Sequence, residues 1–132
     1  MSIDYSQSPQ YHYELAQQIK SLREKGVLII GSGNIVHNLQ ASIPNLSMRQ
    51  EHFAYDWAQE FDAWTTQKIL DKDLSSLVDY TRAPGGLKSV PTPDHYIPML
   101  YALALARKDE TVRFTYDELV YGGISMRCFE IA

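Results

Sequence analysis

Apolar positions recur every three or four residues in three stretches of the chain, which predicts three amphipathic helices. The first helix is expected over residues 13–25 and ends at Gly26, the second lies within residues 51–70, and the third begins near Asp94 with Pro98 in its first turn. We expect a further short helix over residues 71–80, followed by a loop at residues 81–86. The second helix carries an aromatic stripe that we interpret as core packing, namely Phe53, Trp57, Phe61 and Trp64.

The run Val27–Ile30 has a different character, because it is wholly apolar and lies between two glycines. Such a run is typical of a strand that is buried on both faces in a sheet covered by helices. Two further strand-like segments lie near the C-terminus, at residues 111–116 and 124–131. The pattern therefore predicts an α/β fold in which helices flank a central sheet, with Val27–Ile30 as the buried strand.

Composition narrows the classes of function. A length of 132 residues with 45% hydrophobic residues fits one domain covering residues 1–132. A net charge of -4 leaves no basic surface for nucleic acid. Without a long apolar run or a signal-like N-terminus, we expect a cytoplasmic protein that does not enter a membrane. We interpret the single cysteine, Cys128, as a small core or strand residue.

Two histidines are the candidate functional residues. His37 follows a glycine-containing turn, residues 31–34, after the predicted strand, where open α/β sheets bind ligands. Asn34 is expected to cap a short helix that carries His37. His95 is expected at the N-terminus of the third helix, where the helix dipole disfavours imidazolium and leaves a ring nitrogen free for a metal.

Each of these assignments has a structural alternative. His37 could be a core histidine whose hydrogen bonds are satisfied internally, and His95 could only cap its turn. The pair Gly31 and Gly33 resembles the start of a dinucleotide fingerprint, but position 36 is valine, so the third glycine is missing. The other two histidines, His12 and His52, are expected to be surface or capping residues rather than ligands.

Four stretches together resemble a known family. They are Gly26–Leu39, Phe61–Trp64, Pro91–Pro98 and Gly123–Arg127, and in order and spacing they are similar to the extradiol ring-cleavage dioxygenases of the LigB-type superfamily, in particular the DOPA extradiol dioxygenase branch. The resemblance covers nearly the whole chain but only about the C-terminal half of a usual family member. In that family two further metal-binding histidines lie on loops of the N-terminal half.

The resemblance implies a function for both candidate histidines. His95 matches the position of the metal's third protein ligand, and His37 matches the catalytic acid–base residue, which is also viewed as a metal ligand. The implied cofactor is non-haem Fe(II), although Zn(II) could occupy the same ligands. The implied reaction is extradiol cleavage of a catechol-type, DOPA-like substrate with O2.

Three hypotheses follow for the chain itself. It is the C-terminal half of such a dioxygenase and associates with a missing N-terminal half, or it is an incomplete fragment that serves as a binding or assembly domain, or a symmetric homo-oligomer completes its site. Three further polar residues near the matched motifs are interpreted as structural, namely Arg82, Tyr96 and Arg127.

Overall fold

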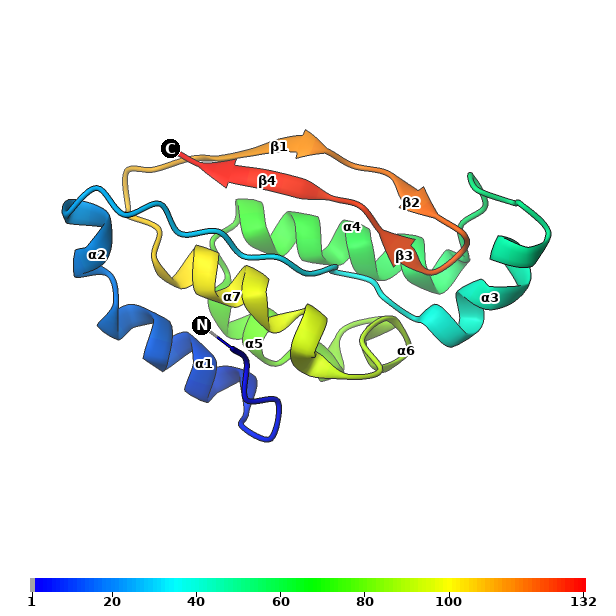
Figure 1. Ribbon diagram of the computed structural model, residues 1–132, viewed down its shortest axis with the longest axis horizontal. Helices are drawn as coiled ribbons and strands as arrows, with labels where there is room; N and C mark the ends of the chain where they lie inside the picture. Colours follow the sequence, from blue (N-terminus) through cyan, green and yellow to red (C-terminus); the bar gives the residue numbers. More distant parts are fainter. Residues whose placement is uncertain (1) are drawn as a thin grey trace.

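Helices are the main regular elements of the computed structural model, which describes residues 2–132 (Figure 1). The α-helices in this part of the chain are α1 (Pro9–Gln18), α2 (Ser21–Glu24), α3 (Leu39–Ser47), α4 (Asp56–Leu70), α5 (Leu74–Val78), α6 (Gly86–Ser89) and α7 (Ile97–Ala104). Two short 3-10 helices, η1 (Tyr80–Arg82) and η2 (Pro93–His95), precede α6 and α7. Four short strands follow, β1 (Val112–Tyr116), β2 (Leu119–Val120), β3 (Ile124–Ser125) and β4 (Cys128–Ile131).

The predicted helices are present, with boundaries set by their caps. α1 begins earlier than predicted because the Ser8 side chain accepts a hydrogen bond from the Tyr11 amide and Pro9 occupies the first turn. The predicted helix over residues 13–25 is divided into α1 and α2, and it ends as expected at Gly26, whose φ is +77°. The aromatic helix is α4, and Phe53 lies before its first turn.

α7 is the centre of the core, because seven of its eight residues are buried. One side of α7 packs on α1 through Tyr101 and Ala16. The other side faces α4 and α5, where Phe61, Leu77 and Leu100 are fully buried. Burying an aromatic or aliphatic side chain of this size contributes about 1.5–3 kcal/mol.

His12 belongs to this core, so the prediction that it is a surface or capping residue is wrong. Its side chain is 1% exposed, and its ring nitrogens lie 2.9 Å from the Tyr101 hydroxyl and 2.8 Å from the Asp4 carbonyl oxygen. These contacts fasten the N-terminal segment to α7. His52, by contrast, is on the surface as predicted.

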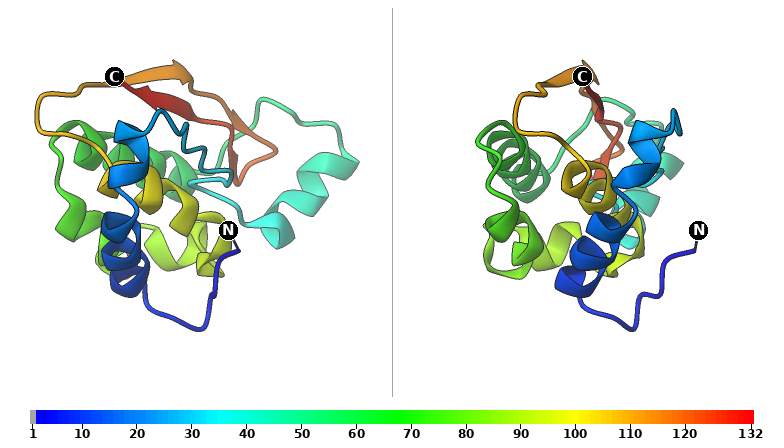
Figure 2. Two further views of the ribbon diagram at one scale, coloured as in Figure 1. Left: turned by 60° about the vertical axis from the view of Figure 1, so that its left-hand side comes forward. Right: turned by 90° about the vertical axis from the view of Figure 1, so that its left-hand side faces the viewer.

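The strands lie on one side of the helices (Figure 2). β1 pairs with β4 in antiparallel fashion, with Val112 opposite Ile131 and Phe114 opposite Phe129, and β2 pairs with β3. The mixture of helices and C-terminal strands confirms the predicted α/β class. The sheets, however, are two separate antiparallel pairs in residues 2–132 rather than one central sheet.

The prediction of a buried central strand at Val27–Ile30 is wrong for this chain. The segment is extended, but in residues 2–132 no strand pairs with it, and the Leu28 and Ile30 side chains are 80% and 79% exposed. A strand needs a neighbour that accepts and donates its backbone hydrogen bonds, and β4 lies across a groove from this segment (Figure 1). The segment has the sequence pattern of a buried strand, but in the described part of this chain it is neither paired nor buried.

None of the helices in residues 2–132 has the length and apolar character needed to cross a bilayer.

Candidate active site

His37 lies on the non-helical stretch before α3. Its amide donates to the Ser89 carbonyl, and the residue forms an isolated β-bridge with Ile124. The predicted short helix capped by Asn34 is therefore wrong: the Asn34 amide donates to the His95 carbonyl and its side chain donates to the Ser125 carbonyl. The capping residue is instead Asn38, which accepts from the Ala41 amide at the start of α3.

The His37 ring is enclosed between two carbonyl oxygens. Nδ1 lies 3.0 Å from the Asn34 oxygen and Nε2 lies 2.8 Å from the Thr92 oxygen, while the residue is only 5% exposed. A neutral imidazole has one N–H, so it can donate to only one of the two carbonyls. The carbonyls therefore favour the charged ring, but burial outweighs them and lowers the pKa of His37 below its ordinary 6.5.

His95 ends η2, immediately before α7, as the sequence predicted for a residue at a helix N-terminus. Its side chain is 52% exposed, and Nε2 lies 3.3 Å from an Asp94 carboxylate oxygen. A hydrogen bond from the Thr92 side chain is the main reason that the pKa of Asp94 is lowered, so this carboxylate is ionised at neutral pH. Within residues 2–132, Nδ1 of His95 makes no hydrogen bond, and the polar contact of the ring is through Nε2.

The two imidazoles converge, with ring centroids 5.1 Å apart and ring planes tilted by 50°. This approach depends on Gly31 and Gly33, which let the extended segment lie directly on the start of α7. A Cβ atom on Gly33 would come 2.1 Å from the His95 carbonyl oxygen, and one on Gly31 would come 2.5 Å from that of Pro98. The glycines thus serve close backbone approach rather than the sharp turn that the sequence indicated.

A buried ion pair supports the His37 side of the site. Arg127 donates to Asp62 at 2.6 Å, and Asp62 also accepts from the Ser125 hydroxyl at 2.7 Å. The Ser125 amide in turn donates to the Val36 carbonyl, next to His37. Sequence reasoning missed this role of Asp62, although a carboxylate inside an otherwise apolar motif is a signal of a buried partner.

The other polar candidates lie elsewhere. Tyr96 is buried and donates to the Leu77 carbonyl, and Arg82 is exposed and pairs with Asp79. Sequence reasoning also missed Asp94, although it directly precedes His95.

The described residues provide only some of the ligands that a metal ion needs. No group of three His, Cys, Asp or Glu side chains in residues 2–132 is arranged to hold one. His95 fits the requirements for one ligand, because its Nδ1 is free and a carboxylate lies beside its other nitrogen, as is common for metal-binding histidines. His37 would have to release a carbonyl oxygen before it could bind a metal.

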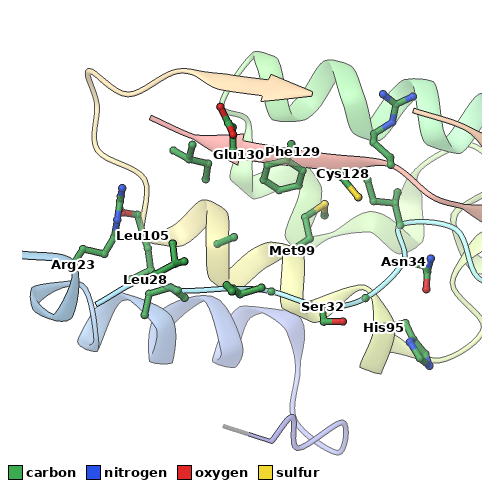
Figure 3. A pocket seen from close by; sticks show the side chains of 18 of the residues that line it. Arg23, Leu28, Ser32, Asn34, His95, Met99, Leu105, Cys128, Phe129 and Glu130 are labelled. Carbon is green, nitrogen blue, oxygen red and sulfur yellow. The ribbon is translucent and has the colours of Figure 1, made fainter. Parts of the chain in front are cut away.

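A groove of about 780 Å³ begins beside His95 (Figure 3). Residues 26–35 form one wall and β4 forms the other, while Met99 and Ala102 of α7, with Leu105 directly after this helix, form the floor. Cys128 lines this groove, and it is an exposed strand residue rather than a core residue.

Comparisons with known proteins agree with this arrangement. Residues 2–127 match the family model described as the catalytic LigB subunit of aromatic ring-opening dioxygenase. The chain is 30% identical to a 4,5-DOPA dioxygenase extradiol of Escherichia coli K12 over 99% of its length, and 30% identical to one of Beta vulgaris over 86%. The crystal structure of an uncharacterized protein from E. coli K12 superposes on 97% of the chain with a TM-score of 0.76 and 28% identity.

The chain therefore belongs to the LigB family of aromatic ring-opening dioxygenases. It spans about half the length of the relatives that it matches: 48% of the E. coli enzyme, 41% of the B. vulgaris enzyme and 52% of the solved E. coli chain.

Proposed function

We propose that this chain supplies one half of an extradiol dioxygenase that opens a catechol-type ring, with a DOPA-like substrate as the first candidate. The relatives named 4,5-DOPA dioxygenase extradiol support the choice of reaction. The observation that carries the proposal is the convergence of His37 and His95, 5.1 Å apart beside a groove. A ring-opening site needs a metal ligand and a proton carrier side by side.

His95 is the proposed metal ligand in this chain, through its free Nδ1, with Asp94 orienting the ring. The resemblance stated above places two further histidines on the other half of the family fold. Bound Fe(II) would supply the redox chemistry with O2, whereas Zn(II) accepts the same ligands without that chemistry.

His37 is the proposed proton carrier. The reaction breaks the ring C–C bond beside the diol, places both atoms of O2 in the product and requires that the catechol hydroxyls lose protons. A ring that is buried, with its pKa lowered, is neutral near pH 7 and can accept such a proton. The resulting imidazolium would then donate to both carbonyls, Asn34 and Thr92, so the accepted proton is stabilised where it arrives.

The test measures ring opening by the protein purified from its native source. A tag after Ala132 is used for the purification, so that any polypeptide joined or bound to the chain is retained. With Fe(II), DOPA and O2 we expect O2 uptake equal to catechol loss and a coloured ring-opened product. His37→Gln should lower kcat by about 100- to 10,000-fold with a smaller change in KM. His95→Ala should abolish turnover, and His52→Ala is the matched surface control.

No ring opening across several catechols by the iron-loaded protein would reject the proposal. So would full activity in the His37→Gln or His95→Ala variant.

A second candidate is a non-catalytic assembly domain that kept the fold of the family. The specific observation in its favour is that both His37 nitrogens already contact carbonyl oxygens, as in a satisfied core histidine. It predicts that the native protein neither retains iron nor opens catechols, and that His37→Gln affects stability alone.

A further inference from the structure

The groove beside His95 is bounded by two extended backbones, which makes it unlike an ordinary small-molecule pocket. Val27–Gly33 runs along one wall and β4 runs along the other, with α7 beneath both (Figure 3). The groove extends from Arg23 at one end to His95 at the other (Figure 3). Extended segments on both sides suit an extended chain as the occupant.

The first wall has unpaired backbone groups. No amide or carbonyl of residues 28–33 makes a hydrogen bond within residues 2–132, although the segment is anchored at both ends: the Val27 amide donates to Leu22 and the Asn34 amide donates to His95. An extended backbone held in place with free donors and acceptors is an open strand edge.

The second wall is an open edge as well. Thr111 and Ala132 exchange two backbone hydrogen bonds, so by antiparallel alternation Glu130 faces β1, while the backbone groups of Phe129 and Ile131 point away from β1. In the described part of the chain β4 has no partner other than β1. Its free edge therefore faces the groove.

The side chains of the first wall indicate that the edge is covered in the functional protein. The all-apolar sequence of Val27–Ile30 is that of a strand buried on both faces, yet Leu28 and Ile30 are among the most exposed apolar side chains of the chain. Gly31 and Gly33 fix the segment against α7, so it cannot fold inward to bury them.

We infer that one β-strand from the half of the LigB-family fold outside this chain's match inserts between Val27–Gly33 and β4. The comparisons indicate which polypeptide fills the groove. This chain superposes over 97% of its length on only 52% of a solved family member, so about half of that fold lies outside the match. The strand pairs with both edges, joins Val27–Gly33 to the β1–β4 ladder in one sheet and covers Leu28 and Ile30. One end of the inserted strand reaches His95, so the strand becomes a wall of the histidine site.

The test compares amide hydrogen exchange in two samples, the recombinant 132-residue chain and the protein purified from its native source through a tag after Ala132. In the native sample, residues 28–33 together with Phe129 and Ile131 should exchange at least about 100-fold more slowly. Mass spectrometry should identify, joined to the chain or bound to it, a sequence matching the other half of the 4,5-DOPA dioxygenases.

Two variants assign the protection to this groove. Leu28→Asp with Ile30→Asp should leave the isolated chain folded, because both side chains are already in solvent, and should abolish the protection. Leu87→Asp, at an equally apolar position that is 69% exposed and outside the groove, should leave the protection unchanged.

Unchanged exchange in the native sample would overturn the inference. Protection in an assembly that contains only copies of this chain would overturn it too, because the occupant would then be a second copy. The readout is independent of catalysis, so it stands whether or not the protein opens catechols.

Discussion

The imidazole of His37 is subject to two opposing influences. Two carbonyl oxygens at 2.8 and 3.0 Å stabilise its charged form, and near-complete burial destabilises that form more strongly. His95, 5.1 Å away between ring centroids, also disfavours the charge, while Asp94 favours it. The ring is therefore neutral at rest but able to accept a proton.

Acidification should accordingly destabilise the protein through His37. Its folded-state pKa lies below 6.5, so the unfolded chain binds the proton more readily, and the free energy of unfolding falls as pH drops below 6.5 until the folded-state pKa is passed. Urea titrations between pH 8 and 5 should show a shallower decline for His37→Gln than for the wild type. An identical decline in both proteins would contradict the lowered pKa.

That window is separate from the loss caused by carboxylates. The hydrogen bond from Arg23 to Glu110 lowers the pKa of Glu110 to about 2 from 4.5, so its stabilising contribution disappears only as pH falls from 4.5 toward 2.

The Asp62–Arg127 pair should matter more for stability than any surface pair. Its side chains are 6% and 12% exposed, so Arg127→Met leaves a buried carboxylate without its partner and should cost about 3–5 kcal/mol of unfolding free energy. Arg113→Met, which breaks the exposed pair with Glu130, is the matched control and should cost at most about 1 kcal/mol. Urea unfolding of both variants measures the difference. Equal losses of unfolding free energy would show that the buried Asp62–Arg127 pair stabilises the protein no more than a surface pair does.

Among the elements, the extended segment of residues 27–34 depends most on its sequence. Its position on α7 is fixed by two glycines whose missing side chains leave room for carbonyl oxygens. The segment therefore determines how closely His37 approaches His95.

Gly33→Ala should separate the two histidines. The new Cβ would meet the His95 carbonyl oxygen, a backbone atom that cannot turn aside, so we expect a loss of about 1–3 kcal/mol. Chemical-shift changes of the His37 and His95 ring protons should accompany the loss. Ser32→Ala, at the exposed position between the glycines, should change neither the stability nor the chemical shifts. A Gly33→Ala protein with wild-type stability and chemical shifts would show that the close approach is not required.

The sequence correctly predicts the elements whose apolar faces are covered by other parts of this chain. The aromatic stripe marks α4, the Pro98 pattern marks α7, and alternating residues mark β1 and β4, because each pattern reports packing that the chain itself provides. The prediction for Val27–Ile30 failed for the same reason, because the apolar pattern predicts burial on both faces and residues 2–132 do not provide it.

For the site, the sequence could propose His37 and His95 as candidates, and the structure brings their rings together, but the surroundings of the two rings could not be predicted. The carbonyl oxygens of Asn34 and Thr92 carry no sequence signal, since every residue has one. The burial of His12 arises from Tyr101, 89 positions away along the chain, and local patterns do not report such contacts.

The whole molecule has the features of one half of a larger fold. A LigB-family match covers nearly all of it, and the relatives are about twice as long. An apolar groove with two open strand edges leads to a pair of histidines, and residues 2–132 contain no group of three His, Cys, Asp or Glu side chains arranged for a metal. Our two proposals give these features one explanation, in which the same polypeptide completes both the groove and the proposed metal site.

Iron content of the native protein tests that explanation most directly. Mass spectrometry of metals in the iron-loaded protein, purified through the tag after Ala132, should give about one iron per chain for the wild type and for His52→Ala. His95→Ala should retain almost none while its hydrogen-exchange protection at residues 28–33 persists. A wild-type protein that holds no iron, or a His95→Ala protein that holds as much as the wild type, would contradict the account.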